Sequence, residues 1–281
     1  MVKYSFILLS LILSLFLASC ETVFYAPGPH IYYPPENYGY TPQELYFPSL
    51  DGTMLSGWLF PSKNLNKKEL IILQFHGNGE NMTSHYTSLA WTTKKGFELI
   101  TFDYRGYGKS EGRLGHKGVI EDAVAVYNIA KKRAVETDQK IILYGQSLGA
   151  NILLKAIEDF EDTHLIHSIF IEGGFLNHKE MAADVLSRFW LTWPFQWLPY
   201  LVISDAYSPD DFYKYFPEDL PLIVIHGDKD RIVPINFGKE IYSLAKPPKQ
   251  WILAENMQHI QSMHDAKYRQ LFLDIVESPP K

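Results

Sequence analysis

Five short apolar runs separated by amphipathic stretches constrain the fold of this 281-residue chain more than any other feature. Strands that are apolar on both faces are typical of a parallel sheet covered by helices on each side. The segments between them have the length and pattern of helices, so strands and helices alternate. The strand candidates are Leu70–Phe75, Leu99–Phe102, Ile141–Tyr144, Ser168–Ile171 and Leu222–Ile225, and the helix candidates are 83–94, 118–133, 148–159 and 236–245.

Both ends of this pattern have a distinct character. Near the start, the segments 45–50 and 54–60 flank Asp51-Gly52, a dipeptide typical of a hairpin turn. Near the end, a last strand is expected around 251–253 and a closing helix around 263–276. The sequence therefore predicts an α/β domain over residues 43–281, with a mostly parallel, doubly wound sheet and an N-terminal antiparallel hairpin.

Residues 175–217 interrupt the alternation, because they separate two strands by far more than a usual connection. The stretch is rich in Trp, Phe, Tyr and Pro. A long aromatic insertion on an α/β core commonly covers a binding site, so we expect a lid or cap here. The alternative is that these aromatic side chains only pack the insertion against the sheet.

The composition is typical of a globular domain, and the net charge argues against a nucleic-acid-binding protein. Hydrophobic residues make up 46% of the chain and charged residues 21%, which is ordinary for a globular domain. The formal net charge of −6 argues against nucleic acid as a partner, because phosphate binding requires a basic face.

The N-terminus has the layout of a secretory signal peptide. Lys3 precedes an apolar stretch over 4–17, and the small residues Ala18 and Ser19 precede Cys20. The ending Leu17-Ala18-Ser19-Cys20 resembles a bacterial lipobox, in which the cysteine sulfur receives a diacylglycerol and becomes the new N-terminus. We therefore expect residues 1–19 to be a lipoprotein signal peptide, residues 20–42 to be an acylated N-terminus and tether, and the chain to be anchored to a membrane of the bacterial envelope.

Gly145-Gln146-Ser147-Leu148-Gly149 follows one predicted strand and precedes a predicted helix. In this context the Gly-x-Ser-x-Gly pattern predicts a sharp turn that exposes a nucleophilic serine. Glycines flank the serine because a side chain at either position would clash in so tight a turn. Ser147 would also lie at a helix N-terminus, where the helix dipole favours negative charge.

With this turn, the chain resembles the α/β-hydrolase superfamily, in particular esterases, monoglyceride lipases, aminopeptidase-like enzymes and membrane-associated α/β-hydrolase-domain proteins. The resemblance runs from about residue 45 to 275. The motifs that carry it, besides the serine turn, are Phe75-His76-Gly77-Asn78-Gly79, the run Asp103-Tyr104-Arg105-Gly106-Tyr107-Gly108-Lys109-Ser110, and His226-Gly227-Asp228-Lys229-Asp230 followed by Val233-Pro234.

The resemblance implies a catalytic triad in the chain order Ser, acid, His. His259 is the favoured base, because only it and His264 follow the last predicted strand. Asp230 is the favoured acid on its spacing from Gly227 and Val233, with Asp228 and Glu172 as alternatives.

The same resemblance implies an oxyanion hole formed by the backbone N–H groups of Asn78 and Leu148. It implies no cofactor and no metal. The expected reaction is cleavage of an ester-like bond in a small or lipid-like acyl substrate. Peptide cleavage and a non-catalytic role on a hydrolase scaffold stay open as alternatives.

Overall fold

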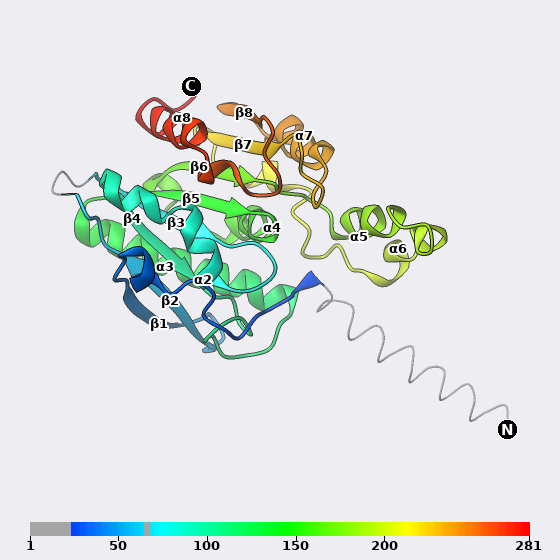
Figure 1. The fold of residues 1–281 in the computed structure, drawn as a ribbon, viewed down its shortest axis with the longest axis horizontal. Helices are drawn as coiled ribbons and strands as arrows, with labels where there is room; N and C mark the ends of the chain where they lie inside the picture. The colour runs from blue at the N-terminus through cyan, green and yellow to red at the C-terminus, as the bar shows by residue number, and fades with distance from the viewer. Residues whose placement is uncertain (1–23, 65–67) are drawn as a thin grey trace.

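The computed structural model describes residues 24–64 and 68–281. Its centre is an eight-stranded sheet with the order β1-β2-β4-β3-β5-β6-β7-β8 (Figure 1). The first hairpin is antiparallel and β2 pairs antiparallel with β4, whereas the pairings among β3 to β8 are parallel. This arrangement confirms the predicted fold class. The strands are β1 Gln43–Pro48, β2 Met54–Phe60, β3 Leu70–Phe75, β4 Glu98–Phe102, β5 Lys140–Gln146, β6 Ile166–Glu172, β7 Leu222–Gly227 and β8 Lys249–Ala254.

Helices cover both faces of the sheet, and alternate strand residues enter two separate cores. Ile71 and Leu73 of β3 belong to one core, while Ile72 belongs to the other. This period of two explains why the strands are apolar throughout. The first core is closed by α3 (His116–Thr137), α4 (Leu148–Ala156) and α7 (Ile235–Leu244), and the second by α2 (Met82–His85), η3 (Tyr86–Ser88), η4 (Ala90–Lys95) and α8 (Ala266–Glu277). Three short turns, η5 (Ile157–Asp159), η6 (Thr163–Leu165) and η9 (Ser262–His264), complete the connections.

The segment 83–94, predicted as one helix, is instead the short helix α2 followed by the 3₁₀ turns η3 and η4. Its hydroxyl side chains explain the difference. Those of Thr87, Thr92 and Thr93 each donate to the carbonyl three residues earlier, over 2.7–2.8 Å. Such local bonds compete with a regular helical ladder and favour tighter turns.

The insertion 175–217 lies between β6 and β7 and contains α5 (His178–Ser187), η7 (Trp193–Phe195), α6 (Pro199–Val202) and η8 (Phe212–Lys214). Its helices α5 and α6 project away from the sheet on one side of the molecule (Figure 1).

Residues 24–42 run across the domain and pack against it. Tyr25 and Tyr40 are buried, and the turn η2 (Pro35–Tyr38) lies between them. Asn81 fixes this stretch by donating to the carbonyls of Gly28 and His30. The predicted signal peptide and Cys20 lie outside the described residues. No helix in the described part of the chain is long and apolar enough to cross a membrane.

Candidate active site

The carboxyl ends of the parallel strands meet at one edge of the sheet, where ligands bind in open α/β folds. Ser147 lies there, between β5 and α4, with backbone angles φ 54° and ψ −118°. A Cβ on Gly149 would lie 2.2 Å from the carbonyl oxygen of Phe75, and one on Gly145 would lie 2.7 Å from the Cα of Ala150. Both glycines of the predicted motif are therefore required by the close approach of the backbone.

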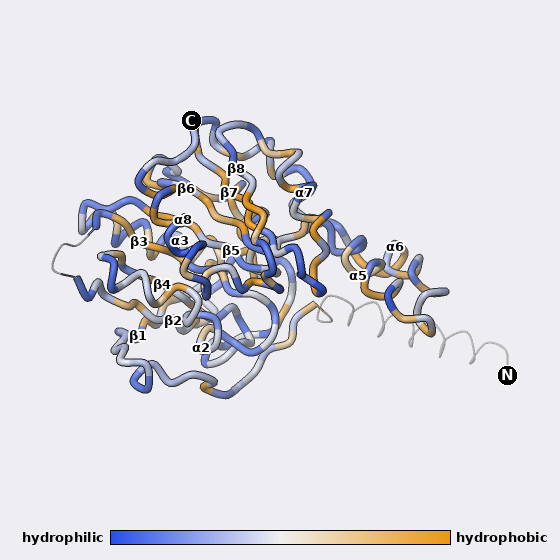
Figure 2. Tube along the Cα trace, turned by 45° about the horizontal axis from the view of Figure 1, so that its top comes forward, coloured by the Kyte–Doolittle hydropathy of each residue, from blue (hydrophilic) through white to orange (hydrophobic). Residues whose placement is uncertain are grey.

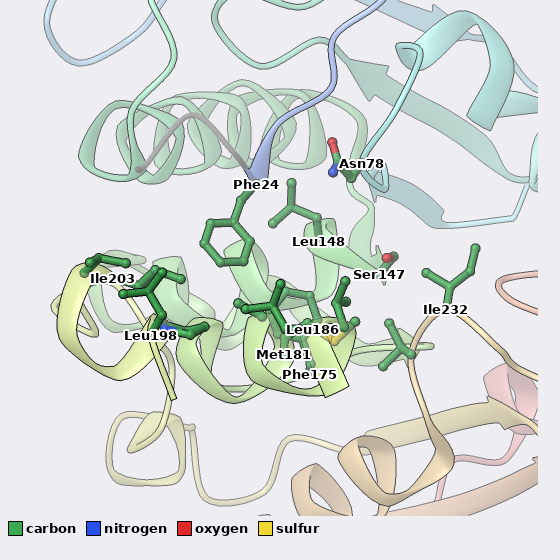
Figure 3. Close-up of a pocket in the computed structure, with 15 residues that line it drawn as sticks. Phe24, Asn78, Ser147, Leu148, Phe175, Met181, Leu186, Leu198, Ile203 and Ile232 are labelled. Atoms are coloured by element: carbon green, nitrogen blue, oxygen red, sulfur yellow. The ribbon is translucent and has the colours of Figure 1, made fainter. Parts of the chain in front are cut away.

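Ser147 faces an apolar cavity of about 440 Å³ that residues of α5 and α6 help to line (Figure 3). The residue is 7% exposed, and its Oγ accepts and donates no hydrogen bond within the described part of the chain. The hydroxyl is thus available to an incoming group. None of the side chains lining this apolar cavity is charged; they are Phe24, Asn78, Ser147, Leu148, Phe175, Met181, Ala182, Val185, Leu186, Leu198, Pro199, Val202, Ile203, Ile232 and Val233.

His259 and Asp230, distant in sequence, are joined by a hydrogen bond of 2.7 Å between Nδ1 and Oδ2. Since Nδ1 carries the proton in this bond, Nε2 of a neutral ring is left as a proton acceptor. Burial alone would raise the pKa of Asp230, but hydrogen bonding to His259, the charge of its imidazolium and the N–H groups of Val233 and Ile232 outweigh burial and lower the pKa. Asp230 is thereby held as a carboxylate.

The end of β6 connects this pair to the serine turn. The backbone N–H of Ser147 donates to the carbonyl of Glu172 over 2.9 Å. The next residue, Gly173, lies against His259, because a Cβ added there would be 3.2 Å from Cε1 and Nδ1 of the imidazole. Two consecutive residues of one strand end therefore contact the nucleophile candidate and the base candidate.

The carboxylate of Glu172 is buried at this junction and fully occupied. Its Oε1 accepts from the backbone N–H and the hydroxyl of Ser262, and its Oε2 accepts from Tyr144 and Gln146. These bonds tie the loop that follows His259 to the strand that precedes Ser147. Glu172 makes no bond to a histidine, so the geometry favours Asp230 over this alternative acid.

The remaining alternatives also have other partners. Asp228 accepts from the backbone N–H of Asn256 over 2.6 Å and so acts as a turn residue. His264 lies in η9, just before α8, and bonds to neither Asp230 nor Ser147. Among the described residues, no group of three potential ligands is placed to hold a metal ion.

The backbone N–H groups of Asn78 and Leu148, two residues that line the apolar cavity, have no hydrogen-bond partner among the described residues. Leu148 is the first residue of α4, where helical N–H groups have no partner inside the helix. The side-chain oxygen of Asn78 accepts from Ala26 N, Gly79 N and the Tyr107 hydroxyl, which holds its loop in place. Both amides have the properties expected of oxyanion donors.

Asp103 contacts the residues on both sides of the loop that contains Asn78. It accepts from the backbone N–H of Met82 over 2.7 Å and lies 3.6 Å from Nε2 of His76. Burial raises the pKa of Asp103 to about 7, and burial lowers the pKa of His76 to about 3. The imidazole of His76 is therefore neutral at pH 7.

Sequence reasoning missed two residues at the site. Phe24 falls within the predicted tether, yet it lines the apolar cavity. His85 lines a second, more polar cavity of about 560 Å³ together with His259 and His264. His85 also lies beside the serine turn, since a Cβ on Gly77 would be 3.3 Å from both His85 Cε1 and Ser147 Cβ. No pattern marks either residue, because both depend on how distant segments pack.

The sheet order, the strained serine turn and the cavity at the strand ends define an α/β hydrolase. The chain belongs to the hydrolase family described as serine aminopeptidase, S33, whose model matches residues 66–218.

The relatives and solved structures agree with this assignment. The uncharacterized protein YfhR of Escherichia coli O157:H7 is 30% identical over 245 residues, covering 85% of this chain and 82% of that protein. The lysophosphatidylserine lipase ABHD12 of Xenopus tropicalis is 28% identical over 72% of this chain and 53% of its own length. The esterase Pf2001 of Pyrococcus furiosus has the same fold, with a TM-score of 0.68, 19% identity, and coverage of 90% of this chain and 97% of that chain.

Proposed function

We propose that this hydrolase cleaves a carboxylic ester or thioester through an acyl-enzyme on Ser147. The observation that carries the proposal is the 2.7 Å bond between Asp230 and His259, at the strand ends that also hold Ser147 in a strained conformation with its hydroxyl unpaired. Esterase and lipase names among the similar proteins are consistent with it.

In the proposed reaction, His259 Nε2 takes the proton of Ser147 Oγ as the oxygen attacks the carbonyl carbon. The amides of Asn78 and Leu148 donate to the resulting oxyanion. The leaving alcohol or thiol takes the proton from His259 as its bond to the carbonyl carbon breaks. Water then attacks the acyl-enzyme, its proton passes to His259 and on to Ser147, and the carboxylic acid leaves. Asp230 stabilises the imidazolium in both steps.

The lining of the apolar cavity favours an uncharged acyl group. A free peptide N-terminus is an ammonium ion that needs an acidic partner, and no charged side chain lines this cavity. Aminopeptidase activity, which the family description suggests, is therefore the second candidate.

The test compares hydrolysis of p-nitrophenyl butyrate by the native chain and by single variants. Ser147→Ala, His259→Gln and Asp230→Asn should each lower kcat by about a thousandfold or more, because each removes a triad member. His264→Gln and Asp228→Asn are matched controls and should keep kcat within about twofold. Equal loss in a control and its triad counterpart would refute the assignment. Faster cleavage of aminoacyl p-nitroanilides than of esters would favour the peptidase.

A non-catalytic role is the remaining alternative, in which the hydrolase scaffold only binds a partner. A binding protein needs no activated serine, so the native chain would neither cleave the ester nor react with a fluorophosphonate.

We also propose that Cys20 is acylated and anchors the protein to the bacterial envelope. The support is the order of charge, apolar stretch and small residues before the cysteine, which is the chain's one thiol. Cells fed an alkyne-bearing palmitate should label the native protein, and Cys20→Ser should abolish that label. Undiminished labelling of the variant would exclude this anchor.

A further inference from the structure

The end of the insertion exposes large apolar side chains at a density unusual for a protein surface. The stretch 189–201, here called the lid tip, contains no charged residue. Trp190 is 77% exposed, Leu201 is 71% exposed and Trp193 is 57% exposed. Phe189, Leu191, Phe195, Trp197 and Tyr200 are each more than half exposed as well. Figure 2 shows orange, hydrophobic segments among white and blue ones in this projecting part of the molecule. Surfaces of this kind mark contacts with a partner or a membrane.

The lid tip is continuous with the apolar cavity. Leu198 and Pro199 belong to the tip and also line that cavity, together with Met181 and Val185 of α5 (Figure 3). An acyl chain moving from the tip toward Ser147 would therefore meet apolar side chains along its path.

The residue types of the tip fit a lipid bilayer better than a protein partner. Three Trp and one Tyr combine a large apolar ring with one polar group, which suits the boundary between lipid headgroups and acyl chains. The tip has no charged side chain that could pair with a charged group on a protein partner. For the same reason its contact with a bilayer does not require anionic lipid. Its Pro residues and short helices also leave no long exposed strand edge for pairing.

The first described residue of the chain also lies at the apolar cavity, next to the lid tip. Phe24 lines the apolar cavity, and Cys20 is four residues earlier. Four residues reach at most about 14 Å. An acyl group on Cys20, as proposed above, would therefore enter the membrane close to the lid and bring the tip to the bilayer surface.

We propose that the lid tip inserts into the headgroup boundary of a lipid bilayer, and that the apolar cavity receives acyl chains directly from that bilayer. The membrane contact follows from the surface alone. The delivery of a substrate rests on the proposed esterase function.

The first test measures insertion by tryptophan fluorescence. The full chain is reconstituted in phosphatidylcholine vesicles with either ordinary or brominated acyl chains, because bromine quenches nearby indoles. Of the six Trp residues, Trp190, Trp193 and Trp197 lie in the tip, and residues 1–23 contain none. Quenching therefore reports the tip and not the N-terminal anchor. We expect at least a 30% loss of emission in the brominated vesicles.

Charged variants that keep every tryptophan provide the control. Leu191→Glu with Leu201→Glu should remove most of the quenching, because burying a carboxylate among acyl chains is unfavourable. Leu50→Glu with Val135→Glu replaces equally exposed apolar residues outside the insertion and should leave quenching unchanged. Absence of quenching in the native chain, or equal quenching in both variants, would overturn the proposal. Cross-linking of two copies through the tip without quenching would assign this surface to self-association instead.

The second test separates membrane delivery from chemistry. The tip variant should hydrolyse a long-chain p-nitrophenyl ester in vesicles at least fivefold more slowly than the native chain. It should hydrolyse soluble p-nitrophenyl acetate at a rate within twofold. Equal rates on the vesicle ester would overturn the delivery step. If neither the native chain nor the tip variant cleaves the acetate, the proposed esterase function has failed. The quenching result still decides the membrane contact in that case.

Discussion

Ser147 has a positive φ that a non-glycine residue adopts only at a cost, and its surroundings hold it there. The glycine pattern in the sequence predicts this conformation, because any larger residue at 145 or 149 would overlap the backbone. The sequence offers three candidates for the acid that pairs with His259, since Asp228, Asp230 and Glu172 all follow predicted strands. Only the packed loops distinguish the three carboxylates.

Gly149→Ala tests the close approach at the serine turn. The added methyl would lie 2.2 Å from the Phe75 carbonyl oxygen, so α4 must shift away from β3 and carry Ser147 with it. We expect kcat for p-nitrophenyl butyrate to fall by at least about a hundredfold, because small displacements at a reacting group are costly. In Gly52→Ala the Cβ meets no atom within 4 Å, so despite its positive φ only stability should fall, by about 1 kcal/mol. Native kcat in Gly149→Ala would contradict the packing argument.

We expect Glu172 to act as a positioning residue, and Glu172→Gln tests that role. An amide cannot accept all four hydrogen bonds that the carboxylate accepts, so the loop between His259 and Ser262 should lose its fixed position. We expect kcat to fall about tenfold with KM nearly unchanged. The exposed Glu255→Gln on the same loop should have no effect. If Glu172→Gln and Glu255→Gln lower kcat to the same extent, and thermal stability to the same extent, Glu172 does not act by positioning the loop.

At the scale of elements, hydrophobic periodicity predicts the sheet and its main helices, because each core strand is buried on both faces. Periodicity fails at 83–94, where threonine hydroxyls compete for backbone carbonyls. It also cannot reveal that residues 24–42 pack on the domain, since these contacts depend on Asn81 and other distant partners.

The turn between β1 and β2 is held to α3 by a buried ion pair. Arg105 donates to Asp122 from Nε and from a terminal guanidinium nitrogen and to Asp51 in the hairpin turn. Asp122→Ala should lower the free energy of unfolding by about 3–5 kcal/mol, because it leaves a buried guanidinium short of its partner. Urea unfolding measures this loss, and the exposed Glu136→Ala on the same helix should change stability by less than about 0.5 kcal/mol. A similar small change in Asp122→Ala would contradict the account.

His178, the first residue of α5 in the insertion 175–217, predicts a dependence of stability on pH. Burial, together with the neighbouring His116, lowers the pKa of His178 from 6.5 to about 3. Between these values the unfolded chain binds a proton that the folded chain does not, so stability falls as pH falls below 6.5. From pH 7 to pH 5 this histidine should account for a loss of about 2 kcal/mol.

Urea unfolding at pH 7 and at pH 5 checks this contribution in His178→Gln. The variant should be less stable at pH 7, because it loses the contact with Ser208, but it should lose about 2 kcal/mol less than the native chain on acidification. An unchanged pH dependence would mean that His178 takes up a proton as readily in the folded protein as in the unfolded chain.

For the whole molecule, the separate features converge on one edge of the sheet. The nucleophile candidate, the Asp–His pair, the two free amides, the apolar cavity and the first described residue of the chain all lie there. Sequence motifs predict the chemistry of this edge because each motif is local. The walls of the cavity and the exposed lid tip could not be predicted, because they arise from segments that meet only in the folded chain.

The central claim is that Ser147 is an activated nucleophile. Its most direct measurement is mass spectrometry of the native protein after reaction with a fluorophosphonate. We predict a single adduct on the peptide that contains Ser147, formed quickly in the native chain and at least about a hundredfold more slowly in His259→Gln. An adduct on another residue, or no adduct in a folded native protein, would contradict the account.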